Sequence, residues 1–262
     1  MQANAPIGMF DSGVGGTSIF KEVHHLLPYE QIIYLADSKN APYGEKSRQA
    51  IIDLSIKNTE FLLEKGCKII VVPCNTATTN AISTLRKRYN VPFIGIEPAI
   101  KPAALGSKSK VIGVLATKGT LASDLFQETS SIYTKDIMVV EVIGKGLVQL
   151  IEEGKKDSDE VHALLLTLLQ PMLKANIDYL VLGCSHYPYL IPQLLKILPA
   201  SVKIIDSGAA VANQTKAVLE QKKIRATLPQ SSSEFYSNAN PKVLCDLIQA
   251  KENNFVCEKI SF

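Results

Sequence analysis

The chain contains the same pattern of segments twice. The segment IGMFDSG begins at Ile7, and a similar segment, IGVLATK, begins 105 residues later at Ile112. The apolar run before Cys74, in KIIVVPCNTAT, recurs 110 residues later before Cys184, in DYLVLGCSHYP. Two more apolar runs match at these offsets, 32–37 with 137–142 and 92–96 with 202–206. A repeat of about 100 residues has the length of a domain, so the sequence predicts one architecture built twice.

Apolar runs of strand length alternate with stretches of helical periodicity along the whole chain. The runs lie near residues 7–10, 32–36, 69–73, 93–96, 111–116, 137–143, 178–183, 202–205 and 233–237. Such alternation predicts βα units and mainly parallel sheets covered by helices on both faces. The predicted fold class is therefore α/β, with two similar doubly wound domains related by a pseudo-twofold axis. We expect the active site in the cleft between them.

The repeat also predicts the domain boundaries. Residues 97–99 and 206–208 follow the fourth strand of each half and are the candidate crossovers between domains. We expect residues 1–97 to form the first domain and residues 98–207 the second. The tail, residues 208–262, is expected to contain one strand and two helices and to return to the first domain.

Composition excludes several classes of protein. The longest apolar runs are well short of the roughly 20 residues that a membrane span needs. The first residues, MQANAP, lack the basic and apolar regions of a secretory signal, so we expect a cytoplasmic protein without a membrane partner. The net charge is only +3, and the basic cluster at 86–88 is short and has no interleaved aromatic residues. A nucleic-acid partner is therefore not expected.

The cysteines are five in number and have no CxxC spacing. This pattern argues against a disulfide framework and against a structural zinc site, so we expect reduced thiols. Free cysteines are commonly buried as small apolar side chains, and we expect this role for Cys67, Cys245 and Cys257.

Cys74 and Cys184 differ from the other cysteines because each follows a strand-like run and precedes a polar turn at which a helix is expected. A helix N-terminus or a cationic neighbour can lower the pKa of a thiol from about 8.5. If the two side chains face each other across a small ligand, one thiolate could remove a proton while the opposite thiol returns one. Such a pair inverts a stereocentre.

Polar residues beside the two thiols fall into two groups. The neutral donors Ser12, Asn75, Thr76, Thr117 and Ser185, together with amides at helix starts, suit the binding of a carboxylate. Two ionisable residues, Asp11 and His186, lie in the segments that should flank Cys74 and Cys184 and could tune their protonation. As alternatives, Asp11 could cap a helix, and His186 could be a hydrogen-bonded turn residue.

The glycine-rich loop DSGVGG, with Asp37 after the next strand, imitates a dinucleotide-binding fingerprint. Glycines at 13, 15 and 16 are followed by Thr17 and Ser18, so the G-x-G-x-x-G spacing fails at its last position. Asp11 would also repel a pyrophosphate. We therefore expect no nicotinamide cofactor, and the spacing of histidines and cysteines indicates no zinc site.

Seven motifs resemble, in order and spacing, those of glutamate racemases, members of the aspartate/glutamate racemase superfamily. They are DSGVGG, Asp37 with Pro42-Tyr43-Gly44, CNTAT, GIEPA, LATKGT, LIEEG and GCSHYP, and they span residues 7 to about 215. The resemblance implies a cofactor-independent isomerase that interconverts L- and D-glutamate and supplies D-glutamate for bacterial peptidoglycan and cell-wall biogenesis. It also implies two similar α/β domains that enclose the amino acid, in a cytoplasmic homodimer.

The resemblance assigns roles to individual residues. It implies that Cys74 deprotonates D-glutamate and Cys184 deprotonates L-glutamate, with Asp11 beside the first thiol and His186 beside the second. Asp37 and Glu152 match carboxylates that support these bases. The implied substrate contacts are Asp11, Ser12, Pro42, Tyr43, Gly44, Cys74, Asn75, Thr76, Thr117, Thr120, Cys184, Ser185 and His186.

Two positions depart from the family pattern. Ser185 stands where the family commonly has threonine, which keeps the hydroxyl and loses a methyl group. Gln149 stands where proline is frequent, and this leaves the choice between Glu152 and Glu153 open. We favour Glu152.

Alternative functions remain at this stage. The same machinery could racemise aspartate or another amino acid, and a non-catalytic protein could use the paired cleft to bind an amino acid. A thiol-disulfide oxidoreductase fits less well, because the two cysteines belong to separate domains and no CxxC is present. Without pyridoxal phosphate as an electron sink, a racemase must stabilise its carbanion-like transition state by hydrogen bonds and exclusion of water. We therefore expect the two domains to close on the substrate.

Overall fold

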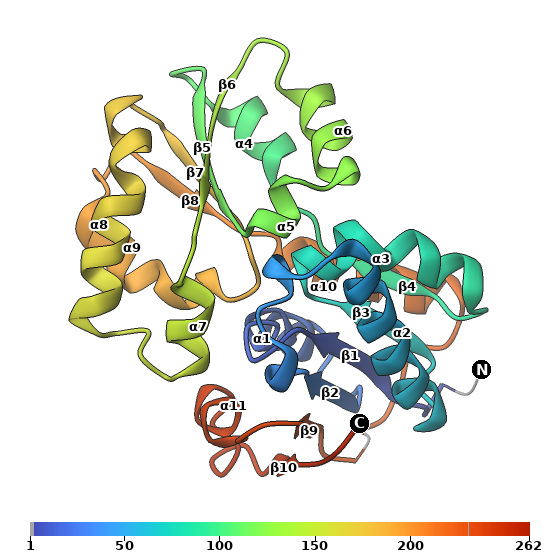
Figure 1. Cartoon of the computed structure of the whole chain (residues 1–262). Coiled ribbons are helices and arrows are strands. Elements are labelled where there is room, and N and C mark those ends of the chain that lie inside the picture. Colours follow the sequence, from blue (N-terminus) through green and yellow to red (C-terminus); the bar gives the residue numbers. More distant parts are fainter. Residues whose placement is uncertain (1–2, 230) are drawn as a thin grey trace.

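The computed structural model describes residues 3–229 and 231–262. They form two lobes, each built around a parallel β-sheet with helices packed against it (Figure 1). This architecture confirms the predicted fold class.

The first sheet has six strands in the order β10-β9-β2-β1-β3-β4, and every neighbouring pair is parallel. Residues of β1 and β3 are wholly buried, as is typical of central strands in parallel sheets covered on both faces. The strands are β1 (Ile7–Asp11), β2 (Ile32–Ala36), β3 (Ile69–Val72), β4 (Phe93–Gly95), β9 (Glu234–Ser237) and β10 (Val256–Lys259).

The second sheet has four parallel strands in the order β6-β5-β7-β8. They are β5 (Val111–Ala116), β6 (Met138–Ile143), β7 (Tyr179–Gly183) and β8 (Lys203–Ile205). Four strands of the first sheet, β2-β1-β3-β4, have the same arrangement: in both sheets the strands of the repeat lie in the order second, first, third, fourth along the chain. The register repeats too: Ile7 pairs with Ile69, and Ile112 pairs with Tyr179, at offsets of 105 and 110 residues. The repeat in the sequence is therefore a repeat in the structure.

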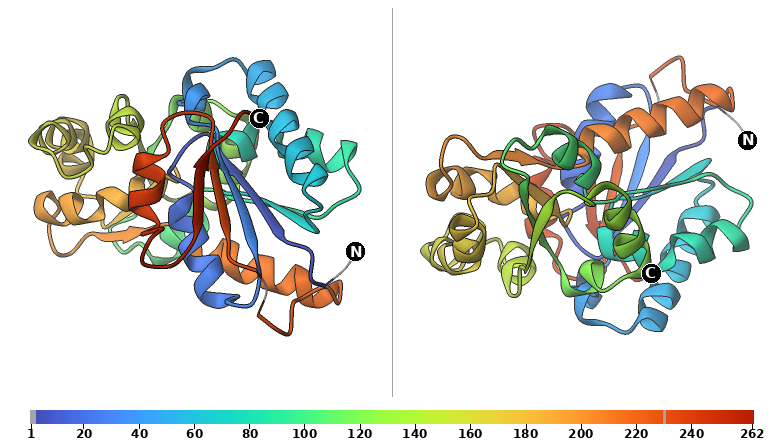
Figure 2. Two further views of the ribbon diagram at one scale, coloured as in Figure 1. Left: turned by 90° about the horizontal axis from the view of Figure 1, so that it is seen from below. Right: turned by 90° about the horizontal axis from the view of Figure 1, so that it is seen from above.

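Helices cover both faces of the first sheet (Figure 2). On one face α1 (Thr17–Leu26) packs against α10 (Gly208–Gln221), and on the other α2 (Arg48–Glu64) packs against α3 (Asn75–Arg88). In the second lobe α4 (Ile100–Gly106) contacts α6 (Asp124–Tyr133), and α8 (Asp159–Lys174) contacts α9 (Ile191–Ile197). The remaining helices are α5 (Lys118–Leu121), α7 (Leu147–Glu152) and α11 (Lys242–Leu247), with 3-10 turns η1 (Ser38–Asn40), η2 (Tyr43–Glu45) and η3 (Tyr187–Leu190).

The C-terminal tail differs from the prediction by one strand. Its two helices are α10 and α11, but it contains two strands, because β10 pairs with β9 and β9 pairs with β2. The sequence of β10, VCEK, has no apolar run, since this edge strand is mostly exposed. We propose the domain division 1–97 with 208–262 and 98–207, which puts each sheet wholly in one domain.

The expectation that all cysteines are reduced is wrong for two of them. Cys245 in α11 and Cys257 in β10 form a disulfide, because the chain turns back between them and brings their Cα atoms within 5.8 Å. Cys67, Cys74 and Cys184 are free and buried. Cys67 packs in the core of the first lobe, as predicted.

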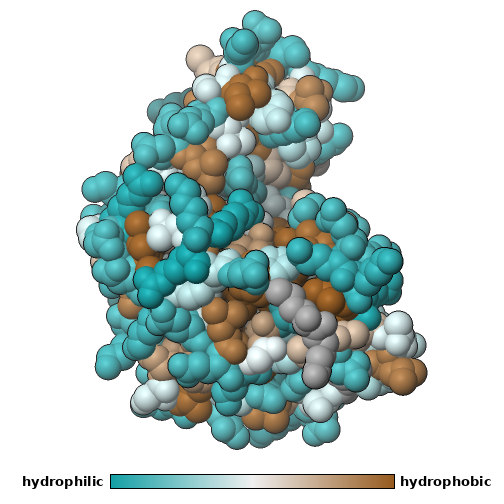
Figure 3. All heavy atoms as spheres, turned by 90° about the vertical axis from the view of Figure 1, so that its right-hand side faces the viewer, coloured by the Kyte–Doolittle hydropathy of each residue, from teal (hydrophilic) through white to brown (hydrophobic). Residues whose placement is uncertain are grey.

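Hydrophilic residues cover most of one face of the molecule, and hydrophobic residues form small separate patches on it (Figure 3). No helix within residues 3–229 and 231–262 is long and apolar enough to cross a membrane. The basic cluster at 86–88 lies exposed in the last turn of α3, as its polar sequence predicts.

Candidate active site

The carboxyl ends of the central strands of both sheets meet at one small cavity. Cys74 lies two residues after β3 and Cys184 directly after β7, so equivalent strand ends deliver the two thiols. Ligands of doubly wound folds bind at this end of the strands. The cavity is lined by Ser12, Pro42, Tyr43, Gly44, Cys74, Asn75, Thr76, Thr117, Val148, Cys184, Ser185 and His186.

This lining contains all the predicted substrate contacts except Asp11 and Thr120, which lie directly behind it. Val148 is the lining residue that the sequence analysis missed, because nothing distinguishes it from the core residues of α7. The cavity measures about 10 Å³, roughly the space of one water molecule. An amino acid with two carboxylates therefore requires the cleft to widen before it can enter.

Cys74 caps the N-terminus of α3. Its Sγ accepts a hydrogen bond from the amide of Ala77 at 3.4 Å and donates one to the Oγ of Ser12 at 3.6 Å. Burial, together with the nearby carboxylate of Asp11, raises the pKa of Cys74 well above its ordinary value, despite the lowering by these hydrogen bonds. The helix N-terminus alone does not make Cys74 a thiolate, so this residue rests as a neutral thiol.

Asp11 is the last residue of β1 and is completely buried. Its carboxylate accepts hydrogen bonds from the amide of Ser12 at 2.8 Å, from the amide of Gly16 and from the Oγ of Ser185 at 3.1 Å. Burial raises the pKa of Asp11 and outweighs the lowering by His186, Cys74 and the Gly16 amide. The N-cap of α1 is Gly16, so Asp11 is not the N-cap residue that was its alternative, although its carboxylate accepts a bond from the amide of Gly16.

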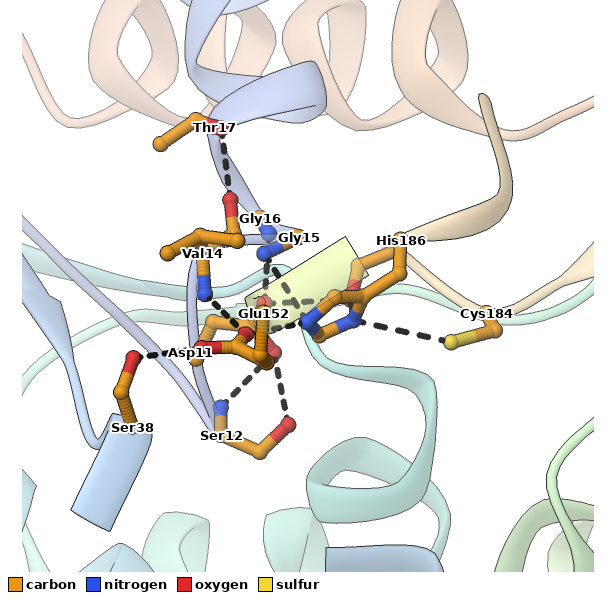
Figure 4. A network of polar contacts seen from close by, with 12 residues as sticks. Asp11, Ser12, Val14, Gly15, Gly16, Thr17, Ser38, Glu152, Cys184 and His186 are labelled. Carbon is orange, nitrogen blue, oxygen red and sulfur yellow. Dashed lines mark hydrogen bonds and ion pairs between the residues drawn. The ribbon is translucent and has the colours of Figure 1, made fainter. Parts of the chain in front are cut away.

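Cys184, His186 and Glu152 form a chain of contacts (Figure 4). The Nδ1 of His186 lies 3.8 Å from the Sγ of Cys184, and its Nε2 lies 2.6 Å from the Oε1 of Glu152. Burial lowers the pKa of His186, but contacts with Cys184 and Glu152 raise it by more than burial lowers it. The net pKa therefore lies well above the ordinary value. The contacts with Cys184 and Glu152 thus favour the protonated form of His186, whereas the amide of Gly15, 3.2 Å from the same Nε2, favours an unprotonated nitrogen there.

Glu152, and not Glu153, points toward the site. Its carboxylate also accepts hydrogen bonds from the amide of Val14 at 2.6 Å and from the Oγ of Ser38 at 2.7 Å, so it joins both lobes. The side chain of Glu153 is 39% exposed and pairs with Lys155 at 2.6 Å. Gln149, at the position that departs from the family pattern, donates to Glu153.

The glycine-rich loop makes room for this chain of contacts. A Cβ atom on Gly13 would lie 1.9 Å from the Oε1 of Glu152, and one on Gly15 would lie 2.2 Å from the Nδ1 of His186. The glycines therefore allow the second lobe to approach the first. Within the residues described, no group of three or more histidine, cysteine or acidic side chains is arranged to hold a metal ion.

The side-chain amide of Asn75 is free to bind a ligand. The residue is buried and lines the cavity, and neither its Nδ2 nor its Oδ1 has a hydrogen-bond partner among the described residues. Leaving such groups unpaired costs about 1–3 kcal/mol each. A ligand with both an acceptor and a donor, such as an amino acid, would satisfy them.

Three threonine hydroxyls also connect the two lobes. The Oγ1 of Thr76 lies 2.8 Å from that of Thr117 and 3.2 Å from that of Thr120. Thr117 caps α5, just as Cys74 caps α3. Thr120 is fully buried, so it orients the other two hydroxyls from behind.

Asp37 is placed differently from the other predicted carboxylates. Its contacts are with the hydroxyl of Tyr43 and the amide groups of Asn40 and Asn238, and none of these is a thiol. The structure thus brings Asp11, Glu152 and His186 to the cysteines and brings Asp37 to the wall of the cavity.

Comparison with known proteins gives one consistent result. The family model for Asp/Glu/Hydantoin racemase matches residues 15–215. A glutamate racemase of Ectopseudomonas mendocina (strain ymp) is 44% identical over 240 residues, 91% of this chain and 91% of the relative. The glutamate racemase of Escherichia coli, solved in complex with L-glutamate and the activator UDP-MurNAc-ala, has a TM-score of 0.86 at 32% identity and 98% coverage of both chains. A Bacillus anthracis glutamate racemase isoform has a TM-score of 0.87 at 29% identity, covering 100% of this chain and 98% of its own.

Proposed function

The chain belongs to the Asp/Glu/Hydantoin racemase family, and from this premise we propose that Cys74 and Cys184 interconvert L- and D-glutamate by proton transfer. It is an isomerase with glutamate racemase activity. The observation that carries the two-cysteine mechanism is that both thiols line one cavity, from equivalent strand ends and with different ionisable neighbours.

In the direction from L- to D-glutamate, Cys184 acts as the base. The imidazolium of His186, held by Glu152, stabilises a thiolate at Cys184, and this thiolate removes the α-proton. The neutral thiol of Cys74 then donates its proton to the opposite face of the α-carbon. One C–H bond breaks and one forms, and the enzyme is left with a thiol at Cys184 and a thiolate at Cys74.

The reverse direction begins from that second state. Cys74 removes the α-proton of D-glutamate, and Cys184 returns a proton on the other face. Asp11 supports Cys74, because a carboxylate whose pKa is raised by burial can exchange a proton with a neighbouring thiol.

The rest of the cavity binds the substrate and stabilises the transition state. The free amide of Asn75 and the hydroxyls of Thr76 and Thr117 provide hydrogen bonds to a carboxylate and the α-amino group. The closed cleft excludes water, which strengthens these interactions as negative charge develops on the substrate. Opening for substrate and closing for catalysis are thus part of the mechanism.

We propose the same biological context as for the family. The D-glutamate product would serve peptidoglycan synthesis and cell-wall biogenesis in the cytoplasm, and the enzyme would act as a homodimer. To test the role in peptidoglycan synthesis, this gene is expressed in a racemase-deficient bacterium, which should then grow without added D-glutamate. Light scattering tests whether the protein is a dimer.

The activity itself is tested with purified protein in deuterium oxide, without added cofactor. We expect loss of optical rotation with either enantiomer of glutamate, together with deuterium at the α-position. Activity that appears only after addition of pyridoxal phosphate would contradict the mechanism. Faster racemisation of aspartate would reassign the substrate, and calorimetric binding of glutamate without any racemisation would indicate a binding protein.

The roles of the thiols are tested by Cys74→Ser and Cys184→Ser. Each should reduce racemisation about 1000-fold or more, because a serine hydroxyl is a far weaker acid than a thiol and does not provide an anionic base near neutral pH. Cys67→Ser is the matched control, since Cys67 is a free, buried cysteine outside the cavity, and it should retain the wild-type rate. Wild-type activity in either of the first two variants would rule out the two-cysteine mechanism.

A further inference from the structure

The side chain of Asn238 in the C-terminal tail contacts the loop after β2 that leads to the cavity wall. This residue directly follows β9, which lies beside β2 in the first sheet (Figure 2, left). The Nδ2 of Asn238 donates a hydrogen bond to the Oδ1 of Asp37, and its Oδ1 accepts one from the amide of Lys39 at 2.9 Å. Asn238 thus holds the start of the loop that follows β2 by two bonds.

Asp37 passes this constraint to the cavity wall. It is 1% exposed, and its Oδ2 accepts a hydrogen bond from the hydroxyl of Tyr43, which in turn accepts one from the Nδ2 of Asn58 at 3.1 Å. Tyr43 is itself buried and lines the cavity next to Gly44. A Cβ on Gly44 would lie 2.7 Å from the Cβ of Thr117, so the wall has little room to shift toward the second lobe.

The buried carboxylate of Asp37 needs several hydrogen-bond donors. Asp37 accepts from Tyr43, from the Nδ2 of Asn40 at 2.8 Å and from Asn238, and these bonds replace the water that burial removes. Two of the three donors belong to the loop itself. Asn238 is the donor that comes from outside it, and so it fixes the position of the loop relative to the sheet.

We propose that Asn238 is a positioning residue for the substrate: through Asp37 and Tyr43 it holds the wall formed by residues 42–44 against the bound glutamate. This inference rests on the proposed function. It gives Asn238, which lies outside residues 15–215 matched by the family model, an indirect connection to substrate binding.

The test is the kinetic comparison of Asn238→Ala and Asn238→Asp with the wild type. Asn238→Ala should raise the KM for both enantiomers about tenfold, as expected for loss of a hydrogen bond to a charged group, and should change kcat much less, because Asn238 contacts neither thiol. Asn240→Ala is the matched control. The Oδ1 of Asn240 caps the nearby amide of Lys242, so this variant also loses a bond in the tail but should keep the wild-type KM.

Asn238→Asp distinguishes positioning from simple destabilisation. The introduced carboxylate keeps the acceptor for Lys39 but faces the carboxylate of Asp37, and two such groups are compatible only when they share a proton. Its KM should therefore approach the wild-type value at low pH and rise as the pH rises. This variant also provides the answer if Asn238→Ala does not fold.

Two outcomes would overturn the proposal. One is a wild-type KM in Asn238→Ala, even if its melting temperature falls, and the other is a KM of Asn238→Asp that follows the wild type at every pH. Calorimetric dissociation constants for D-glutamate give the same comparison without turnover. A wild-type protein that binds glutamate and does not racemise it would thus count against the proposed function and leave the test of Asn238 intact.

Discussion

Cys74 and Cys184 occupy equivalent places in the two halves of the chain, but their ionisable neighbours are of opposite kinds, an acid beside Cys74 and a base beside Cys184. Cys74 lies near the buried carboxylate of Asp11 and rests as a thiol, whereas Cys184 lies 3.8 Å from the Nδ1 of His186. This difference is consistent with the roles proposed above, in which Cys74 donates a proton and Cys184 removes one in the L-to-D direction. This asymmetry is set by single residues, although the architecture around them is symmetric.

The sequence could predict most of these residues but not their contacts. Asp11 and His186 lie close in sequence to a strand end, so they had to be near the site. Glu152 and Glu153 are adjacent, and neighbouring helix residues point about 100° apart, so only one of them can face the cavity. The packing of α7 decides in favour of Glu152.

Glu152→Gln should destabilise the protonated form of His186. Because the contact with Glu152 contributes to the raised pKa of His186, its loss lowers that pKa. The cation is present below the pKa and disappears as the pH rises through it, so kcat/KM for L-glutamate should begin to fall at a lower pH than in the wild type. At neutral pH we expect a loss of about tenfold or more.

Glu153→Gln is the control for this measurement, since Glu153 pairs with Lys155 on the surface, and its pH profile should match the wild type. The assignment of Glu152 is wrong if the two variants give the same profile.

At the scale of elements, burial determines how well the sequence predicts the structure. Each run that forms a central strand is largely apolar because both faces of the sheet are covered, and each was predicted. The strand β10 was missed because it lies exposed at a sheet edge and pairs through its backbone. After Cys184 the chain forms the 3-10 turn η3 instead of the predicted helix start, so the two thiols also differ in local geometry.

The disulfide of the tail is a prediction that chemical labelling can check. Alkylation of the unfolded, unreduced protein should modify three thiols, those of Cys67, Cys74 and Cys184, and reduction should raise the number to five. Replacing both Cys245 and Cys257 by serine should lower the free energy of unfolding by about 3 kcal/mol under oxidising conditions. Racemase activity should not change, because neither residue lines the cavity. Labelling of five thiols without reduction would show that the disulfide does not form.

At the scale of the whole molecule, polar contacts between the lobes hold the cleft closed. Thr17 Oγ1 lies 2.6 Å from the hydroxyl of Tyr189, and Ser18 Oγ donates to the carbonyl of Ser185 at 2.8 Å. Together with the bonds of Glu152, these contacts close the cavity to about 10 Å³. The same contacts must break to admit glutamate, so the closed state has to be stable but reversible.

Gly15→Ala tests the importance of closure. The added methyl group would lie 2.2 Å from the Nδ1 of His186, so the lobes could not approach fully. We expect kcat to fall about 100-fold in both directions, since a displacement of about 1 Å at the reacting groups has an effect of that size. Small-angle scattering with D-glutamate should show a larger radius of gyration than for the wild type.

Ser18→Ala is the comparison for this variant, because it removes one hydrogen bond between the lobes without adding bulk. Its kcat should fall less than about tenfold. A wild-type kcat in Gly15→Ala would mean that catalysis does not require the closed cleft.

The sequence by itself determined the repeated α/β architecture, the strand ends that carry the two thiols and the family to which the chain belongs. These features depend on local patterns, the alternation of apolar and polar residues and the order of short motifs, which any segment carries along the chain. Only the tertiary structure decided that Glu152, and not Glu153, contacts His186. It also explains why the loop at 13–16 is rich in glycine, and it shows how Asp37 and Asn238 support the cavity wall. Such contacts join residues far apart in the sequence, and they depend on how helices and sheets pack, which no local pattern records.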